Sequence, residues 1–130
     1  YTSAAGRQTY QKLLELAAGL LAAGVSVIVH AVLADHEQRG AFADLAGGMG
    51  LPYLIAEFDA PDAVLLERVR ARSGDASDAD AEVLAQQLRG WQPVSESERG
   101  HLHLIDTAMP VDTARLAREL KRRLAGLAPD

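Results

Sequence analysis

The feature that most constrains the fold is a pair of short apolar runs separated by helical patterns. These runs are SVIVHAV at residues 26–32 and PYLIAEF at residues 52–58. A short, β-branched run without polar alternation is typical of a strand that is covered on both faces, as in a parallel sheet. A third run, HLHLID at residues 101–106, alternates between polar and apolar side chains and also predicts a strand.

Amphipathic patterns occupy the stretches around these strands. Their apolar residues recur at three- and four-residue spacing, which places them on one face of a helix. The predicted helices are residues 4–23, 35–47, 61–72, 78–89 and 111–127. Strands that alternate with helices predict one α/β domain over residues 1–130, with a largely parallel sheet of about three strands flanked by helices.

Composition narrows the classes of partner and chemistry. The 130 residues are 48% hydrophobic and carry a formal net charge of −5. An acidic chain lacks the overall positive charge of a nucleic-acid-binding protein, and no apolar run approaches the length of a membrane span. The absence of cysteine excludes disulfides and cysteine-ligated zinc. With no visible signal peptide, we expect a cytoplasmic protein without nucleic-acid or membrane partners.

Candidate chemistry lies where the predicted strands end, because ligands of open parallel sheets bind beyond the carboxyl ends of the strands. Asp59 and Asp106 are candidate acids there, although each could instead cap the helix that follows. His30 could be a hydrogen-bonded core imidazole, or it could serve catalysis or a metal. A metal-dependent hydrolase built on these three residues is disfavoured, since they show no recognisable ligand spacing. We therefore predict no metal site.

Two arginines give a more specific signal. Arg68 and Arg72 lie one helical turn apart and precede the polar stretch SGDASDAD at residues 73–80, which we expect to be mobile. Guanidinium groups beside such a break suit a transferring phosphoryl group, where catalysis depends on charge stabilisation. The alternative is a solvated helix face paired with neighbouring acids.

Taken together, these segments resemble a known family. The chain resembles the C-terminal part of P-loop kinase-like proteins of the AAA domain or predicted kinase type. The resemblance is carried by the stretches SVIVHAVLADHEQRGAF, GLPYLIAEFDAPDAVLLERVRAR and GDASDADAEVLAQQL and by a short strand ending in IDT. Related groups are the zeta-toxins, the gluconate kinases and the polynucleotide kinases. The resemblance covers nearly the whole chain. It implies a partial three-layer P-loop kinase-like fold with a helical lid at about residues 68–90.

The resemblance also implies roles for individual residues. Arg68 and Arg72 match lid arginines that contact phosphates, and Arg39 matches an arginine that follows the first strand of this chain. Asp106 and Thr107 match the loop beside the adenine. For the complete protein, the resemblance implies ATP, Mg²⁺ and a small-molecule substrate.

The chain departs from the family pattern in two places. Where the family usually has Asp-Ala-Thr, this chain has His30-Ala31-Val32. The phosphate-loop motif G-x-x-x-x-G-K-[ST] is absent, and neither lysine, Lys12 or Lys121, follows the required glycines. We therefore expect the chain to be the C-terminal portion of an ATP-dependent small-molecule kinase. We also expect this portion to be inactive on its own. The alternative is a non-catalytic binding or assembly domain derived from such a kinase.

The missing motif has a structural consequence. In the family, the strand before the phosphate loop runs between the strands that match residues 26–32 and 52–58. Without that strand, two apolar strands have unpaired edges, which are costly in water and prone to pairing with another chain. The chain could close up by pairing residues 26–32 directly with 52–58, pair with another chain, or rely on a segment outside the given sequence. Of these we expect self-association as a homo-dimer.

The sequence predicts that the 130-residue chain neither hydrolyses ATP nor transfers its phosphate above background. The reason is that the loop amides and the loop lysine that hold the phosphates are absent. Product formation with Mg²⁺ and ATP measures this directly. Turnover that follows the protein through successive purification steps would contradict the prediction.

Overall fold

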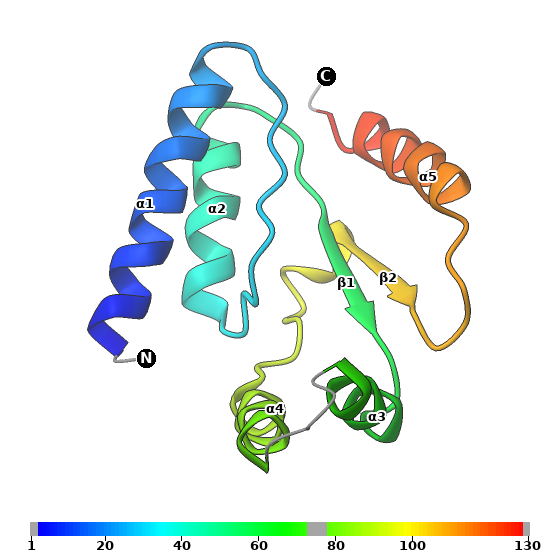
Figure 1. The fold of residues 1–130 in the computed structure, drawn as a ribbon. Helices are drawn as coiled ribbons and strands as arrows, with labels where there is room; N and C mark the ends of the chain where they lie inside the picture. Colours follow the sequence, from blue (N-terminus) through cyan, green and yellow to red (C-terminus); the bar gives the residue numbers. More distant parts are fainter. Residues whose placement is uncertain (1–2, 73–77, 129–130) are drawn as a thin grey trace.

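The computed structural model describes residues 3–72 and 78–128. These form five α-helices, a short 3₁₀-helix and two strands (Figure 1). In chain order the elements are α1 (Ser3–Ala22), α2 (His36–Gly48), β1 (Ile55–Asp59), α3 (Asp62–Arg72), α4 (Asp78–Gly90), η1 (Arg99–His101), β2 (Leu102–Asp106) and α5 (Thr113–Gly126). The first five residues of the predicted break, 73–77, lie outside the described residues, and residues 78–80 begin α4.

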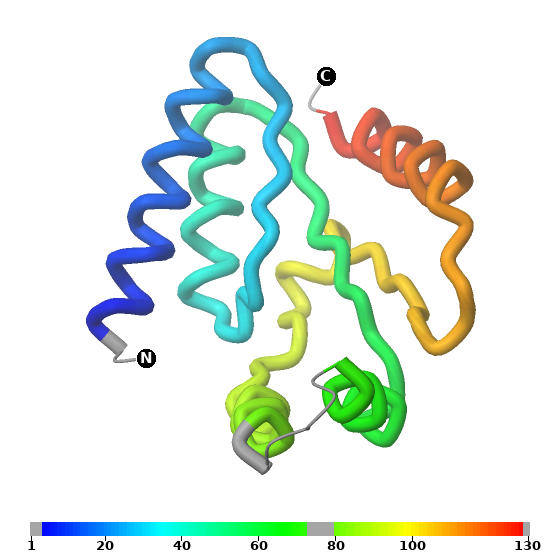
Figure 2. Tube along the Cα trace, in the orientation of Figure 1, coloured from blue at the N-terminus to red at the C-terminus, as the bar shows by residue number. Residues whose placement is uncertain are grey.

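The predicted α/β class is confirmed. Strands β1 and β2 pair in parallel, in a register that runs from Ile55 opposite Leu102 to Asp59 opposite Asp106. Helices α1 and α2 lie on one side of these strands and α5 lies on the other, so the chain has a layered arrangement (Figure 1). The tube in Figure 2 shows α3 and α4 together at the end of the sheet where β1 finishes.

The predicted strand at residues 26–32 is not formed as a paired strand, and this prediction was wrong. The described part of the sheet has only two strands, and residues 26–32 make no main-chain hydrogen bond to any described residue. Hydrophobicity favours an extended backbone here, but a strand also needs a neighbour to satisfy its N–H and C=O groups. Direct pairing of residues 26–32 with β1 does not occur.

The opposite edge of β1 is also open. The Thr107 amide donates to the Asp59 carbonyl at 2.8 Å, so Asp59 directs its carbonyl towards β2. Main-chain groups alternate in a parallel ladder, which leaves those of Ala56 and Phe58 pointing away from β2. Neither residue has a main-chain partner on that side among the residues described.

Residues 26–32 still show the alternation of a strand. Val27, Val29 and Ala31 are half-buried, whereas Ser26, Ile28, His30 and Val32 are exposed. One face of the segment is therefore covered and the other is bare, with Ile28 at 95% exposure. His30 lies on the bare face, so its interpretation as a core histidine was wrong.

Local sequence signals place the helix ends well. Asp35 caps α2 by accepting from the Gln38 amide at 2.7 Å, and Asp112 caps α5 by accepting from the Arg115 amide at 3.0 Å. Helices α3 and α4, which carry the predicted lid, pack against each other. Within the described residues, no helix has the length and apolar character needed to cross a membrane.

The hydrophobic core is small for a chain of this length. Its buried apolar residues are Ala17, Ala46, Ala60 and Ile105, and none of the described large side chains is fully buried. Meanwhile Phe58 and Leu104 on the strands remain more than half exposed. Thus much apolar surface that a closed α/β core would cover remains accessible.

Candidate functional site

The carboxyl ends of the two strands bring together three residues predicted from the sequence. Arg68 on α3 reaches across to Thr107, donating to its hydroxyl at 3.2 Å and to its carbonyl. The Thr107 hydroxyl in turn donates to the Asp59 carbonyl at 2.9 Å. The helix after β1 is therefore tied to the loop after β2, at the edge where ligands of open parallel sheets bind.

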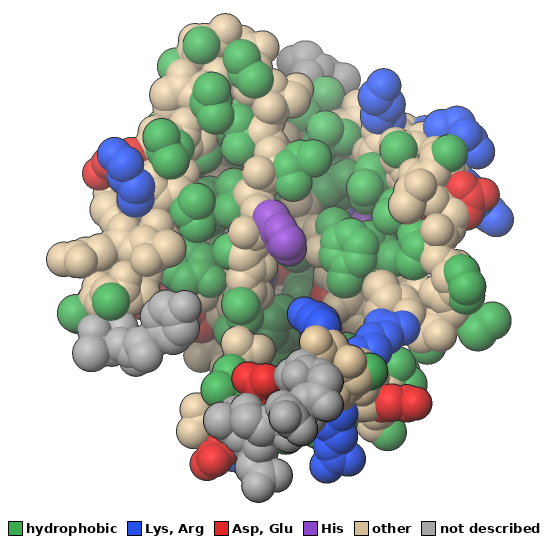
Figure 3. Space-filling view, in the orientation of Figure 1, with side chains coloured by type: hydrophobic (Ala, Val, Ile, Leu, Met, Phe, Trp, Pro, Cys, Tyr) green, Lys and Arg blue, Asp and Glu red, His purple; other side chains and the backbone are tan. Residues whose placement is uncertain are grey.

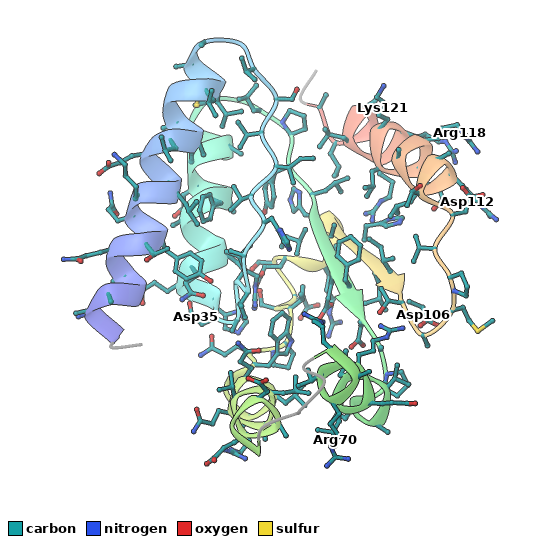
Figure 4. All side chains as sticks on the ribbon, viewed as in Figure 1. Asp35, Arg70, Asp106, Asp112, Arg118 and Lys121 are labelled. Atoms are coloured by element: carbon teal, nitrogen blue, oxygen red, sulfur yellow. The ribbon has the colours of Figure 1, made fainter. Side chains whose placement is uncertain are left out.

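Both candidate acids at this edge organise the local backbone. Asp59 accepts from the Ala60 amide at 2.9 Å, and Asp106 accepts from the Ala108 amide at 2.9 Å. Figure 4 places Asp106 at the end of β2, well apart from Asp112 at the start of α5. The interpretation of these two residues as helix caps was wrong: each carboxylate instead supports the turn after its strand, and Asp112 caps α5.

Burial and charge both act on a third carboxylate, Glu57, at this end of β1. Partial burial raises the pKa of the Glu57 carboxyl, and the nearby Asp59 charge raises it further. The positive charge of Arg39 lowers the pKa of Glu57 and so partly offsets these two effects. Glu57 and Asp59 share one face of the strand, since side chains two residues apart point the same way.

Arg72 lies elsewhere, along an open groove between α3 and α4. The groove is lined by Val69, Arg72, Asp80, Val83, Leu84 and Gln87. Arg68 and Arg72 are one turn apart on α3, yet only Arg68 bonds to the strand-end loop in the described structure. Their proposed phosphate contacts therefore remain predictions.

Arg39, the third predicted arginine, is buried and bonded inside the protein. Its Nε donates to Glu98 at 2.6 Å, its Nη1 donates to the Leu33 carbonyl at 2.9 Å, and its Nη2 donates to the Gln92 carbonyl at 2.8 Å. The guanidinium also lies 5.8 Å from the ring centroid of Trp91. No hydrogen bond or ion pair joins it to Arg68, Arg72, Asp106 or Thr107 in the described structure.

Glu98 is the residue that sequence reasoning missed. Burial alone would raise its pKa, but hydrogen bonds from Arg39, His36 and Ser95 outweigh burial and lower the pKa to about 2. Its Oε1 accepts from the Ser95 hydroxyl at 2.9 Å and lies 2.8 Å from His36 Nδ1. Together, Arg39 and Glu98 form a latch that fixes the segment before β2 against the start of α2.

No metal centre is built from these groups. Within residues 3–72 and 78–128, no set of three or more His, Asp or Glu side chains is arranged to hold a metal ion. His101, whose ring stacks on Tyr53 with centroids 3.8 Å apart, serves packing at the start of β2. His103 instead lies 3.7 Å from Glu119 on α5.

Comparison with known proteins gives one match. A family model described as an AAA domain matches residues 1–94, which is most of the chain. The match includes α1 to α4 and β1 but ends before β2 and α5. Neither the curated proteins nor the solved structures contain a match to the chain.

The latch predicts a specific stability loss. Replacing Glu98 with Gln should lower the free energy of unfolding at pH 7 by about 3 kcal/mol, because it leaves the buried Arg39 charge uncompensated. Glu15→Gln is the matched control, since Glu15 pairs with Lys12 on the surface of α1, and should cost under about 1 kcal/mol. Urea unfolding measures both; equal losses would contradict the latch.

The same carboxyl predicts a pH dependence. Since folding lowers the pKa of Glu98 from the reference 4.5 to about 2, its contribution is complete above about pH 4.5 and is lost as the pH falls towards 2. The loss corresponds to about 3 kcal/mol. The difference in unfolding free energy between wild type and Glu98→Gln should therefore shrink over this range. A difference that stays constant would refute the lowered pKa.

Proposed function

The chain belongs to the AAA domain family, and from this premise we propose that it is the C-terminal portion of an ATP-dependent P-loop kinase acting on a small molecule. The observation that carries the proposal is the bond from Arg68 to Thr107. It joins the helix that leads into the predicted lid to the predicted adenine-side loop, and it does so at the ligand-binding edge of a parallel sheet.

We assign separate roles to the two sides of this edge. Arg68 and Arg72 would contact the phosphates, where positive charge stabilises a transferring phosphoryl group. Asp106 and Thr107 would lie against the adenine. Arg39, a catalytic candidate that the resemblance matches to an arginine following residues 26–32, has an alternative role that its contacts support directly: it orients the segment before β2 through Glu98.

The residues of this chain do not by themselves fit ATP and Mg²⁺. A phosphate site needs backbone amides from a glycine-rich loop, a lysine and a hydroxyl for the metal. Of the two lysines, Lys12 pairs with Glu15 on α1 and Lys121 projects from α5 away from the strands (Figure 4). We therefore derive no phosphoryl-transfer step from this chain alone.

The unpaired backbone supports the same proposal. Residues 26–32 are extended without a ladder partner, and β1 has an open edge at Ala56 and Phe58. In the complete kinase, the strand that leads into the phosphate loop would lie between these two edges. It would pair with both of them and bring the missing amides and lysine to the carboxyl edge of the sheet.

A non-catalytic binding or assembly domain is the second candidate. Two observations favour it: His30 stands where the family usually has an acid, and Arg39 is committed to internal hydrogen bonds. Under this proposal the α/β scaffold would persist without catalysis, and the carboxyl edge would have no preference for nucleotides.

Nucleotide titration followed by NMR distinguishes the two candidates. The kinase proposal predicts weak, millimolar binding of ATP, with amide shifts concentrated at Asp106, Thr107 and Arg68. Arg68→Gln should reduce these shifts, because it removes the charge at the edge. Arg70→Gln is the matched control: Arg70 is on the same helix and points away from the strands (Figure 4).

The outcomes are distinct. Shifts that depend on Arg68 but not on Arg70 support the kinase-derived site. A titration that leaves the strand-end loop unchanged at several millimolar ATP, or that responds equally to both variants, overturns it and favours the non-catalytic domain.

A further inference from the structure

The groove between α3 and α4 is built from one regular face of each helix. The two helices pack against each other at the end of the sheet where β1 finishes (Figure 3 shows the same orientation in space-filling form). Residues at three- and four-residue spacing share one side of a helix. The groove is lined in this way by Val69 and Arg72 on α3 and by Asp80, Val83, Leu84 and Gln87 on α4. Its volume of about 390 Å³ is within the range of small-molecule sites.

Charged and apolar side chains occupy different parts of this groove. Arg72 is the last residue of α3 and Asp80 lies in the first turn of α4, so both charges lie near the helix ends that adjoin residues 73–77. Further along the two helices, the lining is formed by the apolar residues Val69, Val83 and Leu84. Val83 is 52% exposed, so this apolar surface is accessible from solvent.

The two opposite charges of the groove are not paired with each other. Both side chains are exposed, and neither Arg72 nor Asp80 takes part in an ion pair with any described residue. A ligand that carries only a negative charge would be attracted by Arg72 but repelled by Asp80, and a simple cation would meet the reverse. A ligand with one charge of each sign complements both residues.

We propose that the groove binds a free α-amino acid with an aliphatic side chain. The carboxylate of the amino acid accepts hydrogen bonds from the Arg72 guanidinium, and its ammonium group donates to the Asp80 carboxylate. Both charged groups are attached to the same carbon of the ligand, so its aliphatic side chain is free to lie along Val69, Val83 and Leu84. Burial of that side chain against apolar lining adds to the two ion pairs.

Asp80 separates this proposal from the phosphate contact that we propose for Arg72. A carboxylate beside the guanidinium favours a zwitterion and disfavours the several negative charges of ATP. Removing the Asp80 charge should therefore weaken the binding of the amino acid, whereas it should leave the binding of ATP unchanged or tighter. The inference does not depend on a kinase function, although the two proposals share Arg72.

Titration with L-leucine, followed by amide NMR shifts, tests the proposal. We expect saturable shifts at the groove residues, with a dissociation constant of millimolar order. Arg72→Gln and Asp80→Asn should each raise this constant about fivefold, because each removes one exposed ion pair. The matched controls are Arg70→Gln and Glu82→Gln, which lie two residues away on the opposite faces of the same helices and should have no effect. Circular dichroism should show equal helix content for all of these variants.

Analogues of leucine test the need for both charges. Isocaproate keeps the carboxylate and the aliphatic chain but lacks the ammonium group, and isoamylamine keeps the ammonium group but lacks the carboxylate. Each should bind about fivefold more weakly than leucine. Free glycine, which has both charges and no side chain, should also bind more weakly, because it leaves the apolar lining uncovered.

Three outcomes would overturn the proposal. Leucine could give no saturable shifts at tens of millimolar, isocaproate could bind as tightly as leucine, or Asp80→Asn could leave leucine binding unchanged. None of these outcomes alters the shifts that ATP is expected to cause at Asp106 and Thr107. A failure of the amino-acid site is therefore distinguishable from a failure of the nucleotide-site proposal.

Discussion

The structure depends on one requirement: main-chain hydrogen-bonding groups in an extended apolar segment need a partner. Strands β1 and β2 meet it by pairing with each other from Ile55 and Leu102 onward. Residues 26–32 do not meet it, although their composition favours a strand more strongly than that of β2. The exposed face of this segment includes Ile28, which is 95% exposed.

A buried ion pair joins the start of α2 to the segment that precedes β2. Arg39 at the start of α2 donates to Glu98 before β2, and its guanidinium also donates to the carbonyls of Leu33, Gln92 and Pro93. This contact is the latch, and it joins two residues that are 59 positions apart in the sequence. Desolvation offsets much of the attraction within a buried pair, whereas removing one partner leaves a buried charge uncompensated and is strongly destabilising.

Much of the fold could be predicted from sequence because its signals are local. Apolar spacing predicted helices at residues 4–23, 35–47 and 111–127, each within a few residues of α1, α2 and α5. The prediction of a strand at residues 26–32 was wrong because strand pairing depends on residues elsewhere in the chain. An apolar run predicts an extended backbone, but these seven residues alone do not show whether a neighbouring strand exists. Periodicity likewise cannot reveal that Arg39 meets Glu98, since the two are 59 residues apart and Glu98 stands in an irregular stretch.

The candidate site was also predictable from the sequence only in part. The rule for parallel sheets correctly brought Asp59 and Thr107 to one edge, and the structure adds Arg68 to them. The rule for parallel sheets could not predict that Arg39 is hydrogen-bonded inside the protein. Nor could it predict that Arg72 lines a separate groove.

The central claim is that residues 26–32 have no main-chain partner among the described residues and that β1 pairs only with β2 there. Scalar couplings across hydrogen bonds test it most directly, using labelled chain diluted into unlabelled chain so that only bonds within one chain are detected. The account predicts a coupling from the Thr107 amide to the Asp59 carbonyl and none between residues 26–32 and Ala56 or Phe58. Couplings from residues 26–32 to either residue of β1 would show that the sheet closes on itself and would contradict the account.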